Sequence, residues 1–246
     1  MSQTGEEALF SVLDKDVDIH LVESGIYSVL PDTDSGSSYD KSFGNAYDWV
    51  ACNFLYNWII WGYSTKRFDV LTRELLESDD KGIVLDVGCG SLAFAARAYA
   101  AFRGRPVILL DQSIKLLKIA KARLIKYNGQ IPNNLIFLQA DAMALPFKPH
   151  IFTTIISLNL LHVLDDFSPF LAGIKNILTD DSIMLFTTLV KNNRLADRYL
   201  QVWENAGELV SRDILSIERV FRQNRITIEF EIKGNMAYIY FNIIRI

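Results

Sequence analysis

The segment Ile83–Tyr99, with the sequence IVLDVGCGSLAFAARAY, constrains the fold more than any other part of the chain. It begins as a short apolar run with β-branched residues and reaches an acid at Asp86. It then turns through Gly88 and Gly90 and continues as an alanine-rich stretch with helical spacing. This order predicts a strand, a glycine turn and a helix.

From about residue 66 onward the chain alternates between helical and extended patterns. The helical patterns lie at 67–78, 92–102 and 114–126, and near 195–210 and 212–222. The short apolar runs typical of strands lie at 83–87, 107–110, 135–139, 152–158 and 182–189. We expect Ser113 to cap one helix, and Ser168 and Pro169 to open another as N-cap and first helical residue. Such alternation predicts right-handed strand–helix–strand units, a parallel sheet and helices on both of its faces.

The C-terminal sequence departs from this alternation. The stretch ITIEFEIKGNMAYIYFNII contains two extended runs on either side of Gly234 and Asn235. Alternating polar and apolar residues around a Gly-Asn turn predict an antiparallel hairpin. The parallel sheet is therefore expected to end in a hairpin.

The N-terminal region also differs from the core. The turn-forming stretch PDTDSGSSYD indicates a flexible or lid-like entry segment. Eight aromatic residues between Phe43 and Tyr63 form either a helix packed on the core or the wall of an apolar pocket. We expect a helical or lid segment over 1–65 and a core over 66–246. Both belong to one structural domain, because 246 residues suit one large α/β domain.

Composition excludes several classes of protein. A formal net charge of -4 and a pI of about 5.4 oppose binding to nucleic acid. The basic residues of 115–126 follow helical spacing, which indicates a solvated helix face. No apolar run reaches the roughly 20 residues of a membrane span, and the acidic N-terminus does not resemble a secretion signal, so we expect a cytoplasmic protein. Cys52 and Cys89 are too few for a disulfide framework or a zinc cluster, and no metal site is expected.

Acids and glycines gather where the predicted strands end, which is where ligands bind in an open parallel sheet. Gly88 and Gly90 lack the Cβ atoms that would keep a ligand from the backbone. Asp111 could accept hydrogen bonds from both hydroxyls of a ribose, and Asp141 one from an adenine amine. The turn also matches the G-x-G-x-x-G/A pattern of dinucleotide folds. However, Asp86 would repel a pyrophosphate and suits a ligand with a free amino group, such as S-adenosylmethionine.

Five pieces of the sequence carry a family resemblance. They are VLDVGCGS, LLDQS, QADAMALPF, IISLNLLHVL and GNMAYIYF. In their order and spacing over 39–246, the chain resembles the class I S-adenosylmethionine-dependent methyltransferases. The stretch YDWVACNFLYNWIIWGY is similar to the helix that precedes the core in small-molecule methyltransferases of the quinone-biosynthesis type. The resemblance implies a Rossmann-like, doubly wound, seven-stranded α/β sheet, mostly parallel with a C-terminal antiparallel hairpin and an N-terminal helical lid.

The resemblance also implies a cofactor, S-adenosylmethionine, with S-adenosylhomocysteine as product, and a role for each matching position. Asp86 would orient the methionine amino group, while Gly88 and Gly90 let the backbone approach the methionine moiety. The remaining cofactor contacts would come from Asp111 at the ribose, Gln112 beside the adenine, Asp141 with the backbone of Ala142 at the adenine edge, and Leu158 near the sulfonium. One position departs from the pattern, because many relatives have glycine where this chain has Leu92.

The predicted reaction is methyl transfer to a small molecule by in-line displacement. Catalysis can rest on positioning and exclusion of water, and a general base is needed only if the acceptor must lose a proton. Tyr39, Tyr47 and His162 are the candidates for that base, although a lone histidine also fits a purely local hydrogen-bonding role. Trp58 and Trp61 indicate an acceptor with an aromatic, isoprenoid or other apolar portion.

Three other functions stay open at this point. A nicotinamide-dependent oxidoreductase would use the same glycine turn for NAD(P). A non-catalytic methyltransferase-like protein would use its aromatic surface for a partner, and Leu92 keeps that alternative open. A protein or nucleic-acid methyltransferase would share the core, but the acidic balance opposes it. The preferred partner is a small-molecule acceptor, with no nucleic acid and no membrane span, and a homodimer is left open.

Overall fold

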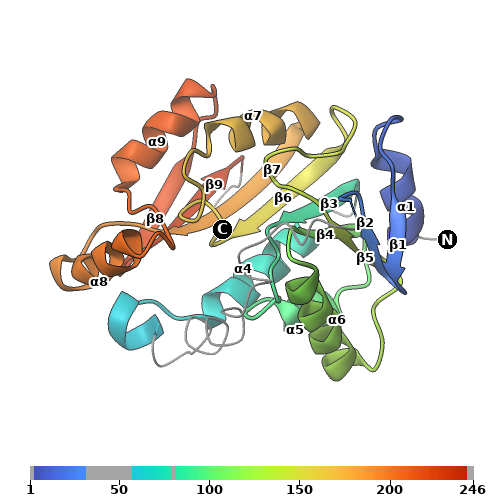
Figure 1. Ribbon diagram of the computed structural model, residues 1–246, viewed down its shortest axis with the longest axis horizontal. Coiled ribbons are helices and arrows are strands. Elements are labelled where there is room, and N and C mark those ends of the chain that lie inside the picture. The colour runs from blue at the N-terminus through green and yellow to red at the C-terminus, as the bar shows by residue number, and fades with distance from the viewer. Residues whose placement is uncertain (1–2, 32–56, 79–80, 243–246) are drawn as a thin grey trace.

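A computed structural model describes residues 3–31, 57–78 and 81–242. In these ranges the chain forms a nine-stranded sheet in the order β1-β2-β5-β4-β3-β6-β7-β9-β8, with helices on both faces (Figure 1). Its strands are β1 His20–Glu23, β2 Ile26–Ser28, β3 Ile83–Val87, β4 Val107–Asp111, β5 Leu135–Gln139, β6 Phe152–Leu158, β7 Leu178–Leu189, β8 Glu229–Lys233 and β9 Met236–Phe241. Its helices are α1 Gly5–Val12, η2 Asn57–Trp61, α4 Lys66–Glu77, α5 Ala96–Ala101, α6 Ile114–Asn128, α7 Ser168–Ile177, α8 Arg194–Asn205 and α9 Ile214–Gln223.

The parallel core confirms the predicted fold class. Strands β2, β5, β4, β3, β6 and β7 run parallel, while β9 pairs antiparallel with both β7 and β8. The chain moves outward from β3 through β4 to β5 and then returns to β6 on the other side of β3. Strand order therefore reverses at β3, and a ligand crevice is expected beyond the carboxyl end of that strand.

Alternating side chains of the strands divide the core into two apolar clusters. On β3, Leu85 and Val87 join a cluster that contains buried residues of α1, α7 and α9. Val84 faces the opposite way and joins a cluster with buried residues of α4, α5, α6 and α8. Asp86 shares the second face, so its carboxyl group points toward the layer that contains α5. The position of this acid is thus a consequence of strand alternation.

The described N-terminal residues 3–31 join the sheet, whereas residues 32–56 of the expected helical or lid segment lie outside the described residues. A capping box of Thr4 and Glu7 starts α1, which packs against the sheet. Strands β1 and β2 form a hairpin at Gly25 (φ +81°), and β2 pairs with β5. The predicted count of seven strands is therefore wrong, because this hairpin adds two. Strands of four and three residues are too short to show a period in the sequence.

Two predicted helix starts also need correction. The helix expected at 92–102 is limited to α5, because the chain is still in the glycine turn at Leu92, where φ is +53°. The N-cap of α7 is Phe167 and not Ser168, which lies in the first turn with Pro169. The Ser168 amide donates to the Asp166 carboxylate instead (2.9 Å), so an acid two residues upstream supplies the missing acceptor.

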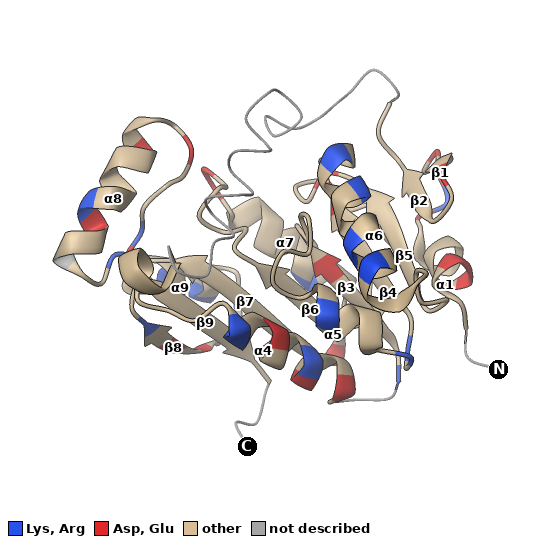
Figure 2. Ribbon diagram, turned by 90° about the horizontal axis from the view of Figure 1, so that it is seen from below, with Lys and Arg blue, Asp and Glu red and all other residues tan. Residues whose placement is uncertain are grey.

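The basic face of α6 is less solvated than the sequence indicated. Lys121 donates from Nζ to Glu23 Oε1 at 2.8 Å and to the Ser24 carbonyl at 2.7 Å. Lys118 forms a longer ion pair with the same glutamate, at 3.7 Å. Figure 2 shows the basic positions of α6 as blue bands along the helix. Two of these basic residues, Lys118 and Lys121, hold the β1–β2 hairpin through Glu23.

The predicted hairpin at the C-terminus is confirmed by the pairing of β8 with β9. Its turn residue Gly234 has φ +57°, and a Cβ added there would lie 2.0 Å from the Trp61 carbonyl oxygen. The turn thus packs closely against η2. Across the described ranges, no helix combines the length and apolar character needed to span a bilayer.

Candidate functional site

The glycine turn after β3 holds its own backbone amides inside the fold. The amides of Gly88 and Cys89 both donate to the Leu110 carbonyl, at 2.8 and 2.9 Å. The Gly90 amide donates to Asp111 Oδ2 at 2.8 Å. A Cβ added at Gly90 would meet no atom within 4 Å, so the turn faces open space there. A ligand can therefore touch this backbone, but three of its amides already have acceptors.

Asp86 lies beneath this turn and is almost completely buried. Its Oδ2 accepts a hydrogen bond from the Tyr99 hydroxyl at 2.7 Å, while Oδ1 is buried and has no hydrogen-bond partner in the described part of the chain. Burial raises the pKa of Asp86 to about 7, the Tyr99 hydrogen bond opposes that rise, and the Asp111 carboxylate adds to it. A buried acceptor of this kind fits a ligand ammonium group or a bridging water.

Asp111 ends β4, directly beside β3. Besides the Gly90 amide on Oδ2, it accepts the Ser113 amide on Oδ1 at 2.9 Å. Both bonds fix the orientation of the carboxylate. Because each carboxylate oxygen can accept two hydrogen bonds, the group can also accept bonds from ligand hydroxyls. Asp86 and Asp111 thus place two acids on neighbouring strands beside one glycine turn.

The loops after β4 and β5 are tied together. Gln139 donates from Nε2 to the Gln112 carbonyl at 3.0 Å. Asp141 accepts the Met143 amide on Oδ1 at 2.8 Å, which orders the turn that contains Ala142. Asp141, Ala142 and Gln112 are all half-buried. The structure therefore places these three predicted adenine contacts on adjacent loops at the carboxyl edge of the sheet.

The loop after β6 approaches the glycine turn from the other side. Leu158, the last residue of β6, is half-buried. Asn159 follows with φ +62°, and its amide donates to the Thr187 hydroxyl at 3.1 Å. A Cβ added at Gly88 would lie 3.1 Å from the Leu160 side chain. Glycine at this position allows the two loops to meet.

Leu92, the departure from the family pattern, is accommodated by the turn. It adopts a left-handed backbone (φ +53°), and its side chain is 2% exposed within the cluster that contains α5 and α6. The Leu92 amide donates to the Cys89 carbonyl at 3.1 Å. Arg123 of α6 donates to the Ser91 carbonyl at 2.6 Å and also bonds the Ser91 hydroxyl. The turn keeps a glycine-like backbone with a buried leucine side chain.

His162 is buried beside β7. Its Nδ1 accepts the Leu189 amide at 3.3 Å and lies 3.2 Å from the Thr188 hydroxyl. Burial, together with the nearby Arg212 charge, lowers the pKa of His162 to about 4. The ring is therefore neutral near pH 7, with the proton on Nε2 because Nδ1 accepts an amide. A general-base role stays a prediction, and it would require a change of tautomer.

The structure describes two of the four aromatic site candidates. Tyr39 and Tyr47 lie outside the described residues. Trp61 is buried in η2 and its ring contacts Tyr199 edge-on at 6.5 Å, whereas Trp58 is largely exposed. The two tryptophans thus have different surroundings, although they share one short helix.

Sequence reasoning missed Tyr99. Its hydroxyl is the direct partner of Asp86, yet it lies 13 residues away in an alanine-rich helix. A tyrosine on the buried side of such a helix needs a partner for its hydroxyl, and that requirement was the available signal.

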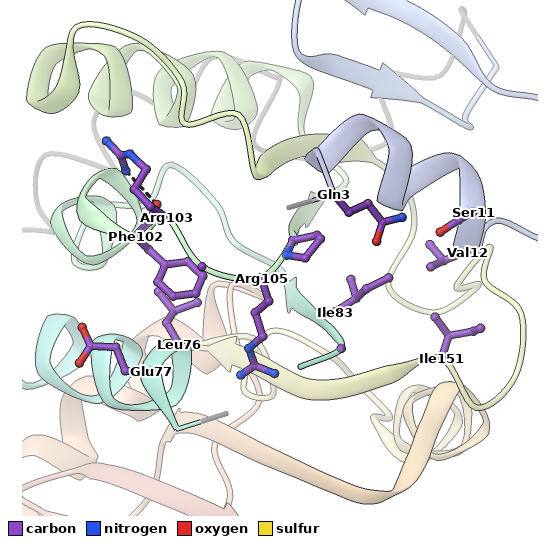
Figure 3. A pocket seen from close by; sticks show the side chains of 13 residues that line it. Gln3, Ser11, Val12, Leu76, Glu77, Ile83, Phe102, Arg103, Arg105 and Ile151 are labelled. Carbon is purple, nitrogen blue, oxygen red and sulfur yellow. Dashed lines mark hydrogen bonds between the residues drawn. The ribbon is translucent and has the colours of Figure 1, made fainter. Parts of the chain in front are cut away.

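A separate hollow of about 710 Å³ lies at the amino ends of β3 and β4, away from the glycine turn (Figure 3). Arg105 lines it and is buried. Its guanidinium donates to the carbonyls of Leu75 and Lys81 and to the Thr153 hydroxyl, each at 3.0 Å. These bonds give Arg105 a structural role in joining α4 to the sheet.

Comparison with known proteins agrees with the fold. Residues 84–181 match a family model described as a methyltransferase domain. The YcgJ protein of Bacillus subtilis is 18% identical, with a TM-score of 0.54 over 65% of this chain and 68% of that one. A putative methyltransferase of Bacillus halodurans is 19% identical, with a TM-score of 0.54 over 66% and 69%. The geranyl diphosphate C-methyltransferase of Streptomyces coelicolor is 11% identical, with a TM-score of 0.55 over 71% and 78%. No curated protein matches the chain.

The fold is similar to that of solved proteins that include named methyltransferases. The family match places a methyltransferase domain at residues 84–181, from β3 into β7. The resemblance to class I S-adenosylmethionine-dependent methyltransferases predicted from the sequence is thereby confirmed.

Proposed function

We propose that the protein transfers a methyl group from S-adenosylmethionine to a small acceptor that is apolar in part. The observation that carries the proposal is the pair of acids at the glycine turn. Asp86 offers a buried oxygen without a partner in the described residues, and Asp111 holds the neighbouring strand end. An ammonium group and a ribose on one ligand match these two acceptors.

The turn amides favour this ligand over a dinucleotide. A pyrophosphate site depends on backbone N–H groups that point at the ligand. Here the amides of Gly88, Cys89 and Gly90 donate to Leu110 and Asp111. A phosphate would therefore meet two carboxylates and few available donors. The same arrangement tolerates a cationic, phosphate-free nucleoside.

The other cofactor contacts follow from the strand ends. Gln112, Asp141 and Ala142 would surround the adenine, and Leu158 would line the site near the sulfonium. When bound, S-adenosylmethionine supplies an activated methyl group. The protein then needs to hold the acceptor in line and to exclude water.

The acceptor class rests on the aromatic residues and on relatives. Trp58 and Trp61 are the proposed acceptor contacts, and Tyr39, Tyr47 and His162 are the candidates for a base where the acceptor must lose a proton. Structural neighbours include proteins named as a geranyl diphosphate C-methyltransferase and a phosphoethanolamine N-methyltransferase. These names support a small molecule as the acceptor.

Isothermal titration with S-adenosylmethionine and S-adenosylhomocysteine tests the cofactor site. The wild-type protein should bind both, and Asp111→Ala should abolish binding. Asp180→Ala, an exposed acid on β7, is the matched control and should bind normally. Absence of binding by the wild-type protein, or stronger thermal stabilisation by NADH or NADPH, would contradict the proposal.

An acceptor screen tests the substrate class. Phenols, isoprenoids and small amines are incubated with labelled cofactor, alongside peptides and nucleic acids. Methylation of a small apolar compound is the expected result. Methylation of peptides or nucleic acids alone would exclude the proposed acceptor class.

A further inference from the structure

Helix α8 carries apolar residues on two adjacent faces. Ala196 and Leu200 are buried and belong to the core cluster on that side of the sheet. Leu195, Tyr199 and Val202 follow the spacing i, i+4, i+7 and form a second stripe along the helix. All three side chains of this second stripe are exposed, so they are not part of the apolar core.

The short helix η2 extends this stripe. Trp58 and Ile59 are exposed on η2, and Trp61 of the same helix contacts the Tyr199 ring. Figure 1 shows η2, in cyan, beside α8 at the left end of the molecule. We call the set of Trp58, Ile59, Leu195, Tyr199 and Val202 the α8–η2 patch. Its five side chains are between 48% and 72% exposed, which is unusual for large apolar residues that lie together.

The charged residues of α8 differ in whether they contact the rest of the protein. Asp197 of α8 accepts a hydrogen bond from the Asn235 side chain at 2.7 Å, and Glu204 accepts one from the Ser211 hydroxyl at 2.7 Å. Both acids thus accept hydrogen bonds from other parts of the protein. Arg198, one turn from Leu195, is exposed to solvent. Among the described side chains of α8, Arg198 is therefore the one exposed charge, and the exposed acid Glu208 lies beyond the end of the helix.

The patch lies at the carboxyl edge of the sheet, the edge that also carries the glycine turn. The Asn235 amide donates to the Trp61 carbonyl at 2.8 Å. The Asn235 carbonyl in turn accepts the Val190 amide at 2.8 Å, and Val190 directly follows β7. Helix η2 and the start of α8 are thereby attached to the end of a parallel strand.

We propose that the α8–η2 patch docks the protein on the surface of a lipid bilayer. Exposed tryptophan, tyrosine and aliphatic side chains beside a basic residue are the composition of helices that lie in a membrane interface. Arg198 would face anionic headgroups. A stable protein interface uses about 20 to 30 residues on each side, far more than this patch offers. Docking would turn the carboxyl edge of the sheet toward an apolar phase.

Vesicle sedimentation tests the proposal on the full-length protein, without cofactor. Phosphatidylcholine vesicles with and without phosphatidylglycerol are the probes. The wild-type protein should sediment with the vesicles, more strongly when they are anionic. The double variant Leu195→Glu, Val202→Glu should lose roughly tenfold or more in binding, because each change removes apolar area from the interface. Leu21→Glu on β1, at the opposite edge of the sheet, is the matched control and should bind as the wild type does.

Two further measurements on the same variants separate the outcomes. Melting temperatures and S-adenosylmethionine titration should be unchanged in the double variant, which shows that the lost function is surface docking and not the cofactor site. The proposal is overturned if the folded wild-type protein sediments with neither kind of vesicle, or if the double variant binds vesicles as well as the wild type does. Size-exclusion chromatography that shows a dimer in the wild type and a monomer in the double variant would assign the patch to a second copy, and would equally overturn it.

Discussion

Replacing Leu92 by glycine tests whether packing of the leucine side chain stabilises the protein by more than the strained backbone at this position costs. The left-handed backbone at Leu92 (φ +53°) costs a side-chain-bearing residue about 1–2 kcal/mol, and glycine removes that cost. The buried side chain, 2% exposed, contributes in the opposite direction. Truncating a buried leucine typically costs about 2–5 kcal/mol. We therefore expect Leu92→Gly to lower the free energy of unfolding by about 2 kcal/mol.

For a chain of this size, that loss corresponds to a fall in Tm of roughly 4–8 °C. Thermal unfolding followed by circular dichroism measures it. Leu92→Ala is the matched variant, because it removes the side chain but keeps the backbone strain. It should be less stable than Leu92→Gly by about 1 kcal/mol. Cofactor affinity should change little in Leu92→Gly, since the turn amides keep their acceptors.

The order of stability is therefore wild type, then Leu92→Gly, then Leu92→Ala. A glycine variant that melts at or above the wild-type temperature would refute the packing argument. An alanine variant more stable than the glycine variant would refute the strain argument. Either result would mean that the turn relaxes in a way that this backbone geometry does not show.

Three further predictions concern buried polar groups. Tyr99→Phe should weaken S-adenosylmethionine binding about 3- to 10-fold by removing the hydrogen bond to Asp86, while Tyr238→Phe, whose buried hydroxyl has no partner in the described residues, should not. Cofactor affinity should fall from pH 8 to pH 6, because Asp86, with a pKa of about 7, becomes protonated over this range. Titration of the protein with S-adenosylmethionine near pH 7 should therefore release a proton. Asp86→Asn should abolish that release. The free energy of unfolding should fall by up to about 3 kcal/mol as the pH drops from 6.5 to 4, because His162 is protonated in the unfolded chain but stays neutral when buried in the fold. Melting temperatures measured over this pH range should depend less on pH in His162→Gln than in the wild type.

Local sequence patterns determined the core of this fold. The strands at 83–87, 135–139 and 152–158 have the predicted bounds, because a short apolar run between turn residues is a property of neighbouring residues. The same holds for the Ser113 cap of α6, whose hydroxyl accepts the Leu116 amide, and for the hairpin at Gly234. The positions of the strand-end acids follow from these elements.

Tertiary structure alone decided which groups those acids meet. The Tyr99 bond to Asp86, the Gly90 amide on Asp111 and the Leu189 amide on His162 join residues that are 13, 21 and 27 positions apart. Addition of the β1–β2 hairpin to β5 is likewise a long-range event. No periodicity encodes such contacts, because they depend on how separate elements pack. The sequence by itself determined a glycine turn with acids around it, and packing determined which of their atoms stay available to a ligand.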